Sequence, residues 1–361
     1  MTTPPRSQHK GRGALSNPEG RFETRHREDV EDDSGHHEDD ELPPLETTVT
    51  AEPARSIISR NQSPDIPFEQ SINPYRGCEH GCIYCYARPS HAYLNLSPGL
   101  DFETKLFYKA HAAELLEQEL RKPGYRCQPI TLGANTDPYQ PIERKLKVTR
   151  SLLEVLQRFQ HPVSIITKSA LVTRDLDILA DMAKQDLVSV MVSVTTLDDA
   201  LKRSLEPRAP SSWVRLKTVH KLAMKGVPVG VLTAPIIPRV NDAEMERILE
   251  HAAKAGACCA GYVLLRLPYE VKDLFREWLA THMPLKAEHV MSLIRQSRGG
   301  KDYDAEFGAR MRGTGEYAEL IAKRFSLACK RLNLVHARRM QLNSMHFRVP
   351  SESSQLDLWS S

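Results

Sequence analysis

The sequence has few of the features that mark membrane or secreted proteins. It lacks a run of the roughly 20 apolar residues that span a bilayer, and its first residues carry no apolar stretch typical of a secretory signal. Cysteine is scarce, with seven residues in 361, and an odd number does not suit a framework of disulfide bonds. We therefore expect a cytoplasmic protein with no membrane partner.

The chain also has little excess of either positive or negative charge. The formal net charge is only +3, which is too small to indicate a partner. The basic residues are unevenly placed, however, because residues 286–349 hold 13 Lys or Arg against 6 Asp or Glu. Stretches at 295–301 and 308–315 combine glycine with arginine, so this region can approach phosphates. A glycine-rich hinge with solvated arginines explains the same pattern equally well.

The cysteines that are present lie mainly in one place. Cys78, Cys82 and Cys85 are separated by three and then two residues. Three thiolates on a short loop can converge on three irons of a four-iron four-sulfur (4Fe-4S) cluster and leave the fourth iron open for chemistry. The alternative is a zinc site in which His80 or His91 completes a Cys3His set. Zinc is the weaker prediction, since no second pair of ligands follows in the sequence.

With Tyr84 before its last cysteine, this loop resembles the signature of the radical S-adenosylmethionine (SAM) superfamily. The resemblance implies that Cys78, Cys82 and Cys85 bind a 4Fe-4S cluster and that SAM binds to the open iron. It also implies a reductant such as flavodoxin or ferredoxin, whose electron cleaves SAM to methionine and a 5′-deoxyadenosyl radical. That radical abstracts a hydrogen atom from a substrate.

Strand-like and helix-like segments alternate through the middle of the chain. Residues 163–167, for example, form a continuous run rich in β-branched residues, typical of a strand covered on both faces. Such alternation predicts an α/β fold of parallel strands with right-handed crossovers. The resemblance implies the partial (β/α)6 TIM barrel of the superfamily. The expected strands are residues 71–75, 129–133, 163–167, 187–194, 227–233 and 261–267, and the expected helices are residues 104–121, 143–159, 173–184, 211–225, 242–255, 270–296 and 315–332.

Composition divides the chain into four parts. Residues 1–50 are polar and highly charged, which predicts a disordered tail. Residues 51–267 are expected to form the barrel core, with the cluster loop at 74–91. Residues 268–349 are expected to form a helical, basic extension, and residues 350–361 a short tail.

Polar residues follow the carboxyl ends of the expected strands, where the chemistry of such barrels collects. Three of these stretches resemble the spore photoproduct lyase subgroup of the superfamily: Thr-Asp-Pro-Tyr at 136–139, Thr-Lys-Ser at 167–169, and Glu-Pro-Arg-Ala-Pro at 206–210. The resemblance runs from about residue 57 to residue 267, roughly three-fifths of the chain.

The resemblance also implies the residues that contact SAM. Lys168 is expected to bind the SAM carboxylate, because an ammonium group suits a carboxylate. Ser193 is expected to contact the ribose or methionyl part, and Thr136 to lie near the amino acid group. Arg208 is a further expected cofactor contact. From the residues alone, Lys168 can equally be solvated, and residues 135–139 can simply cap a turn.

One position departs from the lyase pattern. Spore photoproduct lyase has a cysteine at the end of the second strand that returns a hydrogen atom to the product radical, and Ala134 stands there in this chain. Tyr84 and Tyr86 are therefore the candidate catalytic residues, expected to border the adenine or the substrate and able to donate hydrogen. The departure argues against the lyase reaction itself and for a relative with another substrate.

Three functions remain open at this point. The first is a radical enzyme acting on nucleic acid, in the manner of DNA lesion repair. The second is a radical enzyme with the same cofactors that modifies RNA or protein. The third is a non-catalytic metal-cluster module that binds nucleic acid through its basic carboxyl-terminal region.

Overall fold

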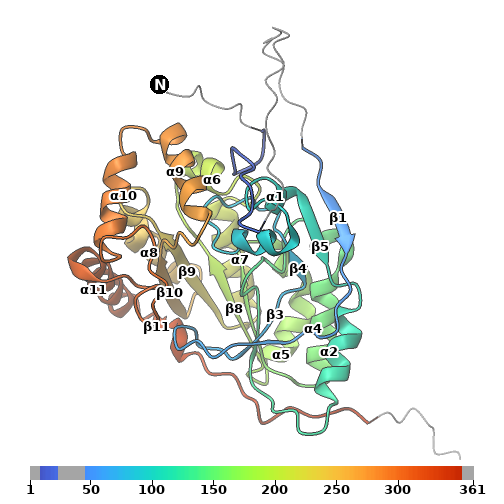
Figure 1. Ribbon diagram of the computed structural model, residues 1–361. Coiled ribbons are helices and arrows are strands. Elements are labelled where there is room, and N and C mark those ends of the chain that lie inside the picture. Colours follow the sequence, from blue (N-terminus) through green and yellow to red (C-terminus); the bar gives the residue numbers. More distant parts are fainter. Residues whose placement is uncertain (1–8, 23–44, 352–361) are drawn as a thin grey trace, which may run out of the picture.

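The structure, a computed structural model, describes residues 9–22 and 45–351 (Figure 1). Our predictions of disorder for residues 1–8 and 23–44, and of a tail for residues 352–361, concern residues outside the described ones.

The described residues contain one large sheet of eight strands. Its strands are β2 (Ser59–Arg60), β3 (Gln70–Ile72), β6 (Ile130–Leu132), β7 (Val163–Thr167), β8 (Val188–Ser193), β9 (Val229–Ile236), β10 (Cys259–Leu264) and β11 (Val335–His336). Strands β3, β6, β7, β8, β9 and β10 lie side by side in this order, and all five pairs are parallel. This confirms the predicted alternation and the partial barrel. Strand β2 adds an antiparallel edge, and β11 a parallel one.

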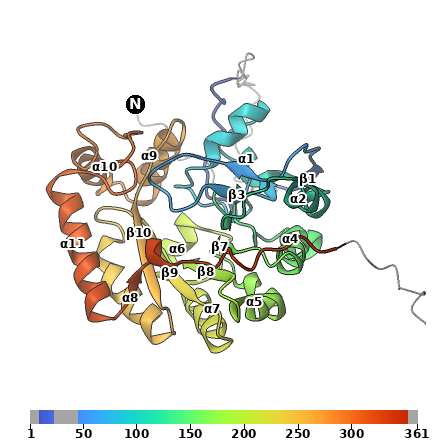
Figure 2. The same cartoon turned by 90° about the horizontal axis from the view of Figure 1, so that it is seen from below.

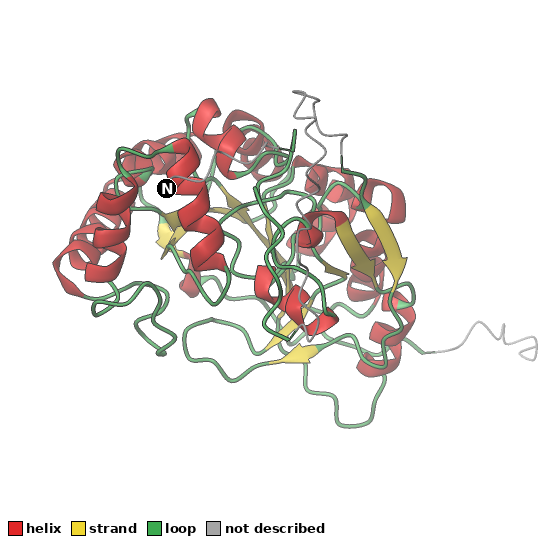
Figure 3. Cartoon of the chain, turned by 45° about the horizontal axis from the view of Figure 1, so that its top comes forward, coloured by secondary structure: helices red, strands yellow, loops and turns green. Residues whose placement is uncertain are grey.

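Helices cover the outer side of the sheet, as Figure 2 shows from below and Figure 3 by colour. The sheet is therefore enclosed, and all six residues of β8 are buried. The helices of the barrel region are α1 (Asp101–Thr104), α2 (Ala112–Leu120), α3 (Glu143–Leu146), α4 (Val148–Arg158), α5 (Leu176–Ala183), α6 (Asp199–Leu205), α7 (Ser212–Met224) and α8 (Met245–Lys254), with 3-10 turns η1 (Arg88–Leu94), η2 (Ala170–Asp175), η3 (Asp242–Glu244) and η4 (Ala337–Arg339).

A second, three-stranded sheet corrects the helix that we predicted at 104–121. Residues Lys105–Tyr108 form strand β5, which pairs in parallel with β1 (Thr48–Ala51) and antiparallel with β4 (Tyr75–Arg76). Helix α2 begins only at Ala112. The prediction was wrong here because the partner strand lies more than 50 residues earlier, where a local pattern cannot reveal it.

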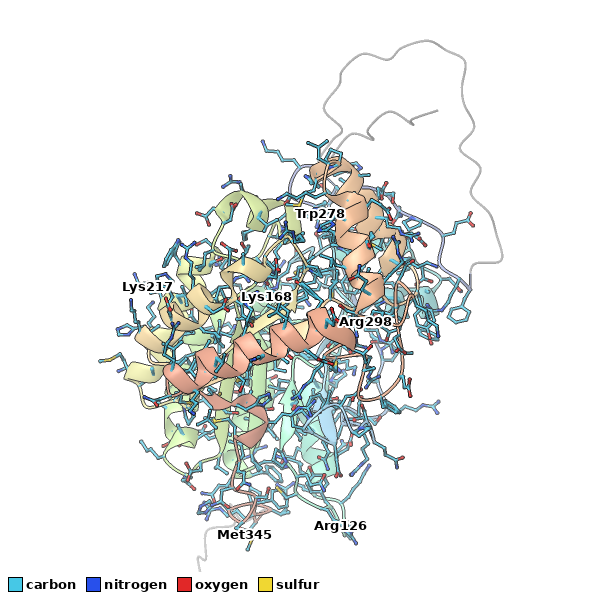
Figure 4. The ribbon with its side chains drawn as sticks, turned by 90° about the vertical axis from the view of Figure 1, so that its left-hand side faces the viewer. Arg126, Lys168, Lys217, Trp278, Arg298 and Met345 are labelled. Atoms are coloured by element: carbon cyan, nitrogen blue, oxygen red, sulfur yellow. The ribbon has the colours of Figure 1, made fainter. Side chains whose placement is uncertain are left out.

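The predicted helical extension is present as three helices. They are α9 (Val271–His282), α10 (Ala287–Gln296) and α11 (Gly315–Arg331). Pro284 lies between α9 and α10 and explains why the expected single helix is broken. Helix α9 carries Trp278, which is fully buried and donates from Nε1 to Ser204 O at 3.0 Å (Figure 4). Trp278 belongs to the same apolar cluster as Cys82 and Tyr84, so the extension packs against the cluster loop.

Residues 9–22 also correct the sequence prediction, because they are packed against the barrel and not disordered. Arg12, Gly13, Ala14 and Leu15 are all buried. The Glu103 carboxylate accepts hydrogen bonds from Gly13 N and Ala14 N, Arg12 donates to the Glu103 carbonyl, and Ala14 also joins the apolar cluster around Trp278. A polar composition hides this kind of ordering.

Within the described ranges, no helix combines the length and the apolar character needed to cross a membrane.

Candidate active site

The cluster loop leaves β4 and lies at the carboxyl ends of the barrel strands. Its backbone is held by Cys78 N, which donates to Phe102 O at 2.9 Å, and by two tight turns that close at Gly81 and Cys85. Gly81 has a positive φ of 66°, which glycine adopts without strain. Cys78 and Cys82 are buried, and Cys85 is half-buried. The three thiols are therefore presented from one short, well-anchored loop.

The donor chemistry of the loop fits an iron–sulfur cluster. Burial raises the pKa of Cys78, and the charges of Asp137, Cys82 and Cys85 raise it further. Burial also raises the pKa of Cys82 to about 12, with Glu206 adding to the effect. Burial and neighbouring negative charge disfavour free thiolates here, so thiolates on this loop need a positive partner, which iron would supply.

The two histidines of the alternative zinc site face other groups, and in the part of the chain that the structure describes the Nδ1 atom of each has no hydrogen-bond partner. His91 is buried against Phe102, and its Nε2 lies 2.9 Å from Lys105 O. His80 Nδ1 lies 3.4 Å from Asp137 Oδ2. Among the residues that the structure describes, no three His, Cys, Asp or Glu side chains are placed to hold one ion.

Lys168 follows β7 and is positioned by its own backbone. Its N–H donates to Asp137 Oδ2 at 2.7 Å, and Thr167 donates to the other oxygen at 2.6 Å. Burial alone would raise the pKa of Asp137, but His80 and these hydrogen bonds outweigh it and lower the pKa to about 2. The Lys168 ammonium lies over the ring of Tyr84, 5.7 Å from its centroid; Figure 4 labels Lys168.

Glu206 lies at the centre of a hydrogen-bond network in this part of the site. It is fully buried and accepts hydrogen bonds from Tyr84, from Thr195 at 2.7 Å and from Arg215. Burial opposes its ionisation, but Arg215 and Lys168 outweigh burial and lower the pKa of Glu206 to about 2.

The carboxylate of Glu206 in turn keeps Lys168 charged. The Lys168 ammonium lies 4.0 Å from Glu206 Oε1. Burial works against that charge, but Cys82 and Glu206 outweigh burial and raise the pKa of Lys168. A cation thus stands beside the cluster loop at all ordinary pH values.

A second buried carboxylate, Glu103, anchors the loop elsewhere. It accepts hydrogen bonds from Gly13 N at 3.0 Å, from Ala14 N at 2.9 Å and from the fully buried Arg88. Arg88 continues the chain of contacts, since its Nε donates to Cys82 O at 2.9 Å. A carboxylate and a guanidinium therefore connect residues 9–22 to a cluster cysteine.

The remaining predicted site residues fall into two groups. Ser193 is buried at the end of β8, and its carbonyl accepts from Arg215 Nη1 at 3.1 Å, so it lies with the Glu206 network. Thr136 donates to Tyr75 O at 2.7 Å, and Arg208 donates to Glu79 Oε1 at 3.1 Å. These last two brace the cluster loop, and their contact with a cofactor stays a prediction.

The two candidate tyrosines differ in access. Tyr84 is buried, and its hydroxyl is engaged by Glu206. Tyr86 is 41% exposed, and its hydroxyl donates to Ala134 O at the end of β6. Of the two phenols, Tyr86 is therefore the one that a substrate can reach.

Sequence reasoning missed the supporting residues. Glu206 lies in a stretch that we singled out, but nothing there revealed its role, and Arg215 and Arg88 gave no signal at all. Glu103 follows Asp101 in an acidic turn that predicts only a helix start.

Comparison with known proteins adds three findings. A family model described as the Radical SAM superfamily matches residues 72–252. An uncharacterized protein of Mycobacterium tuberculosis (strain ATCC 25618 / H37Rv) is 36% identical over 233 residues, which is 64% of this chain and 68% of the relative. An uncharacterized protein of Acidianus two-tailed virus is 29% identical over 248 residues, which is 66% of this chain and 76% of the relative.

Solved structures give the same picture of the fold. A spore photoproduct lyase variant superposes with a TM-score of 0.58 at 15% identity, over 80% of this chain and 81% of that one. Another variant, with bound AdoMet and dinucleoside spore photoproduct, gives 0.57 at 15% identity over 82% of each chain. At this identity the likeness extends to the fold alone.

Proposed function

The chain belongs to the radical SAM superfamily, and from this premise we propose that it cleaves SAM reductively and uses the radical to abstract hydrogen from a nucleic-acid substrate. Superfamily membership brings a 4Fe-4S cluster, SAM and an external reductant. The observation that carries the proposal is the placement of three thiols on one loop beside a half-buried, charged lysine.

Each group of side chains has a distinct task in this proposal. Cys78, Cys82 and Cys85 would hold three irons of the cluster. When bound, the cluster supplies the electron that splits SAM into methionine and a 5′-deoxyadenosyl radical. The ammonium of Lys168 binds the SAM carboxylate, and Glu206 keeps that ammonium charged and aligned.

The substrate class is proposed from two observations. The fold is similar to that of spore photoproduct lyase, one variant of which holds a dinucleoside spore photoproduct. An exposed phenol, Tyr86, also lies directly after the last cluster cysteine. Because Ala134 occupies the position of the lyase cysteine, we propose a different hydrogen transfer on a base or base lesion, with Tyr86 as the candidate hydrogen donor.

The basic extension contributes less to this proposal than its composition predicted. Several of its arginines are neutralised within the chain: Arg295 by Glu288, Arg310 by Asp65, Arg324 by Glu246 and Arg331 by Glu250. Charge counted along the sequence therefore overstates the positive surface.

The test is an anaerobic assay on the reconstituted, reduced protein with SAM. We expect 5′-deoxyadenosine to form, and more of it with ultraviolet-irradiated DNA than with untreated DNA. The Cys82→Ala variant is the control and should form none. The proposal would be contradicted if protein with a full cluster formed no 5′-deoxyadenosine with irradiated DNA, untreated DNA, RNA or a peptide. Stimulation only by RNA or by a peptide would keep the radical chemistry and replace the substrate.

A further inference from the structure

Arg266 lies just after β10, and its guanidinium covers the ring of Tyr86. The distance from Arg266 Cζ to the ring centroid is 4.8 Å. Tyr86 follows Cys85 and reaches Ala134 at the end of β6 through its hydroxyl. The cluster loop, β6 and β10 thus meet at this stacked pair, which lies at the mouth of the barrel.

The guanidinium of Arg266 is poorly satisfied. Its Nε is buried and has no hydrogen-bond partner among the described residues. Its other contacts are weak, with Nη1 3.6 Å from Met311 Sδ and Nη2 3.4 Å from Tyr303 Oη. No carboxylate of the described chain forms an ion pair with it. A buried N–H without an acceptor is costly, so its persistence calls for a reason.

The neighbouring arginines show what a structural arginine looks like in this fold. Arg298, labelled in Figure 4, donates to Ala309 O at 2.8 Å and to Leu265 O at 2.8 Å. Arg310 is paired with Asp65 and Ser63. Both have their donors filled by oxygen atoms of the chain. Arg266 differs from them because its strongest contact is the face of an aromatic ring.

The chemistry of this arrangement selects a particular ligand. A guanidinium stacked on a ring still donates hydrogen bonds in its own plane, and the weakly bonded Nη1 and Nη2 of Arg266 match two oxygens of a phosphate group. The SAM carboxylate already has a cation in Lys168. Aromatic rings beside an arginine are also the usual platform for an unstacked base.

We propose that Arg266 binds a phosphodiester of the substrate strand and so holds the adjoining nucleotide over Tyr86 at the barrel mouth. This inference rests on the proposed nucleic-acid function and adds the residue that positions the substrate.

The test measures binding and not turnover. The probe is a fluorescein-labelled single-stranded oligothymidylate, untreated or ultraviolet-irradiated, titrated by anisotropy with reconstituted protein and SAM at several salt concentrations. We expect Arg266→Gln to weaken binding about tenfold or more, as for loss of a charged hydrogen bond. The slope of log affinity against log salt should also fall by about 0.7, the value for one phosphate contact on a single strand.

Two variants control for charge and for fold. Arg331→Gln removes the same charge from the exposed side of α11, where Glu250 is its partner, and should change affinity by less than about twofold. Arg266→Lys keeps the charge without the planar fork, so it should bind with intermediate affinity. If Arg266→Gln fails to fold or to retain iron, the affinity of Arg266→Lys tests the role of Arg266 instead.

Each outcome has one reading. If wild-type protein binds oligothymidylate and Arg266→Gln binds within twofold of it, the role of Arg266 is overturned while the nucleic-acid proposal stands. If Arg266→Gln loses affinity only for SAM, or only for an acidic peptide, the phosphodiester assignment is likewise overturned. If the wild-type protein binds no oligonucleotide, the proposed substrate fails and the inference fails with it.

Discussion

Two buried carboxylates, Glu103 and Glu206, serve the same loop in different ways. Both are fully buried, and each is paired with a fully buried arginine. Glu103 has only fixed partners, namely Arg88 and two backbone N–H groups of residues 9–22. Glu206 has hydroxyl partners and also faces Lys168, whose side chain is 18% exposed. One carboxylate fastens the loop, and the other prepares a cation that can meet a ligand.

The largest effect is expected from Glu103→Ala. Removing one partner of a buried pair leaves the Arg88 charge uncompensated, which typically costs about 3–5 kcal/mol. We expect a loss of this size in the free energy of unfolding of the cluster-free protein, measured by urea denaturation, and a lower iron content after reconstitution. The matched control is Glu114→Ala on the exposed face of α2, which should be nearly neutral. A Glu103→Ala protein that is as stable as the wild type and binds a full complement of iron would show that Glu103 does not hold the cluster loop in place.

The next largest effect is expected in the pH dependence of stability, to which Glu206 contributes. The pKa of Glu206 is about 2 in the fold against an ordinary value of 4.5, so the unfolded chain takes up the proton first as pH falls. Its stabilisation is therefore complete above pH 4.5 and is lost as pH approaches 2. Between pH 6 and pH 3 this amounts to about 2 kcal/mol.

Glu206→Gln cannot take up this proton. The stability difference between wild type and Glu206→Gln, measured without cluster, should therefore shrink by that amount between pH 6 and pH 3. A stability difference that stays constant between pH 6 and pH 3 would show that the fold does not lower the pKa of Glu206.

The contact between residues 9–22 and the cluster loop should give a somewhat smaller effect. A Cβ added at Gly13 would lie 1.8 Å from Gly81 O, so the two backbones could not keep their approach. Gly13→Ala should cost about 1–3 kcal/mol, as overpacking usually does. It should also speed the loss of the iron absorbance in a chelator, compared with Lys10→Ala at an exposed position. Equal rates for the two variants would mean that the segment does not support the loop.

The smallest expected effect is a change in SAM affinity, which should differ between variants of Glu206 and of Glu103. Lys168→Gln and Glu206→Gln should each weaken SAM binding by about tenfold, since a charged hydrogen bond to the carboxylate is lost or misaligned. Glu103→Gln molecules that retain iron should bind SAM as the wild type does. Equilibrium dialysis of iron-matched samples would measure this, and equal losses in all three variants would contradict the division of labour.

The parts that were predictable are those encoded locally. The apolar run at 163–167 and the spacing of Cys78, Cys82 and Cys85 each carry their meaning within a few residues. What was missed depends on partners far apart in the chain. Glu103 meets Gly13 90 residues away, and Arg310 meets Asp65 245 residues away. Local patterns do not reveal such pairs, so the same residues looked like a polar tail and a basic surface.

Residues 9–22 have a consequence for the order in which the chain is completed. Ser16 donates to Glu277 at 2.6 Å, and Arg21 pairs with Glu270, so this early segment finds its last partners in α9 and just before it. A ribosome makes the segment long before it makes those partners, and domains fold as their parts emerge. Residues 9–22 can therefore complete their contacts only after α9 has been made.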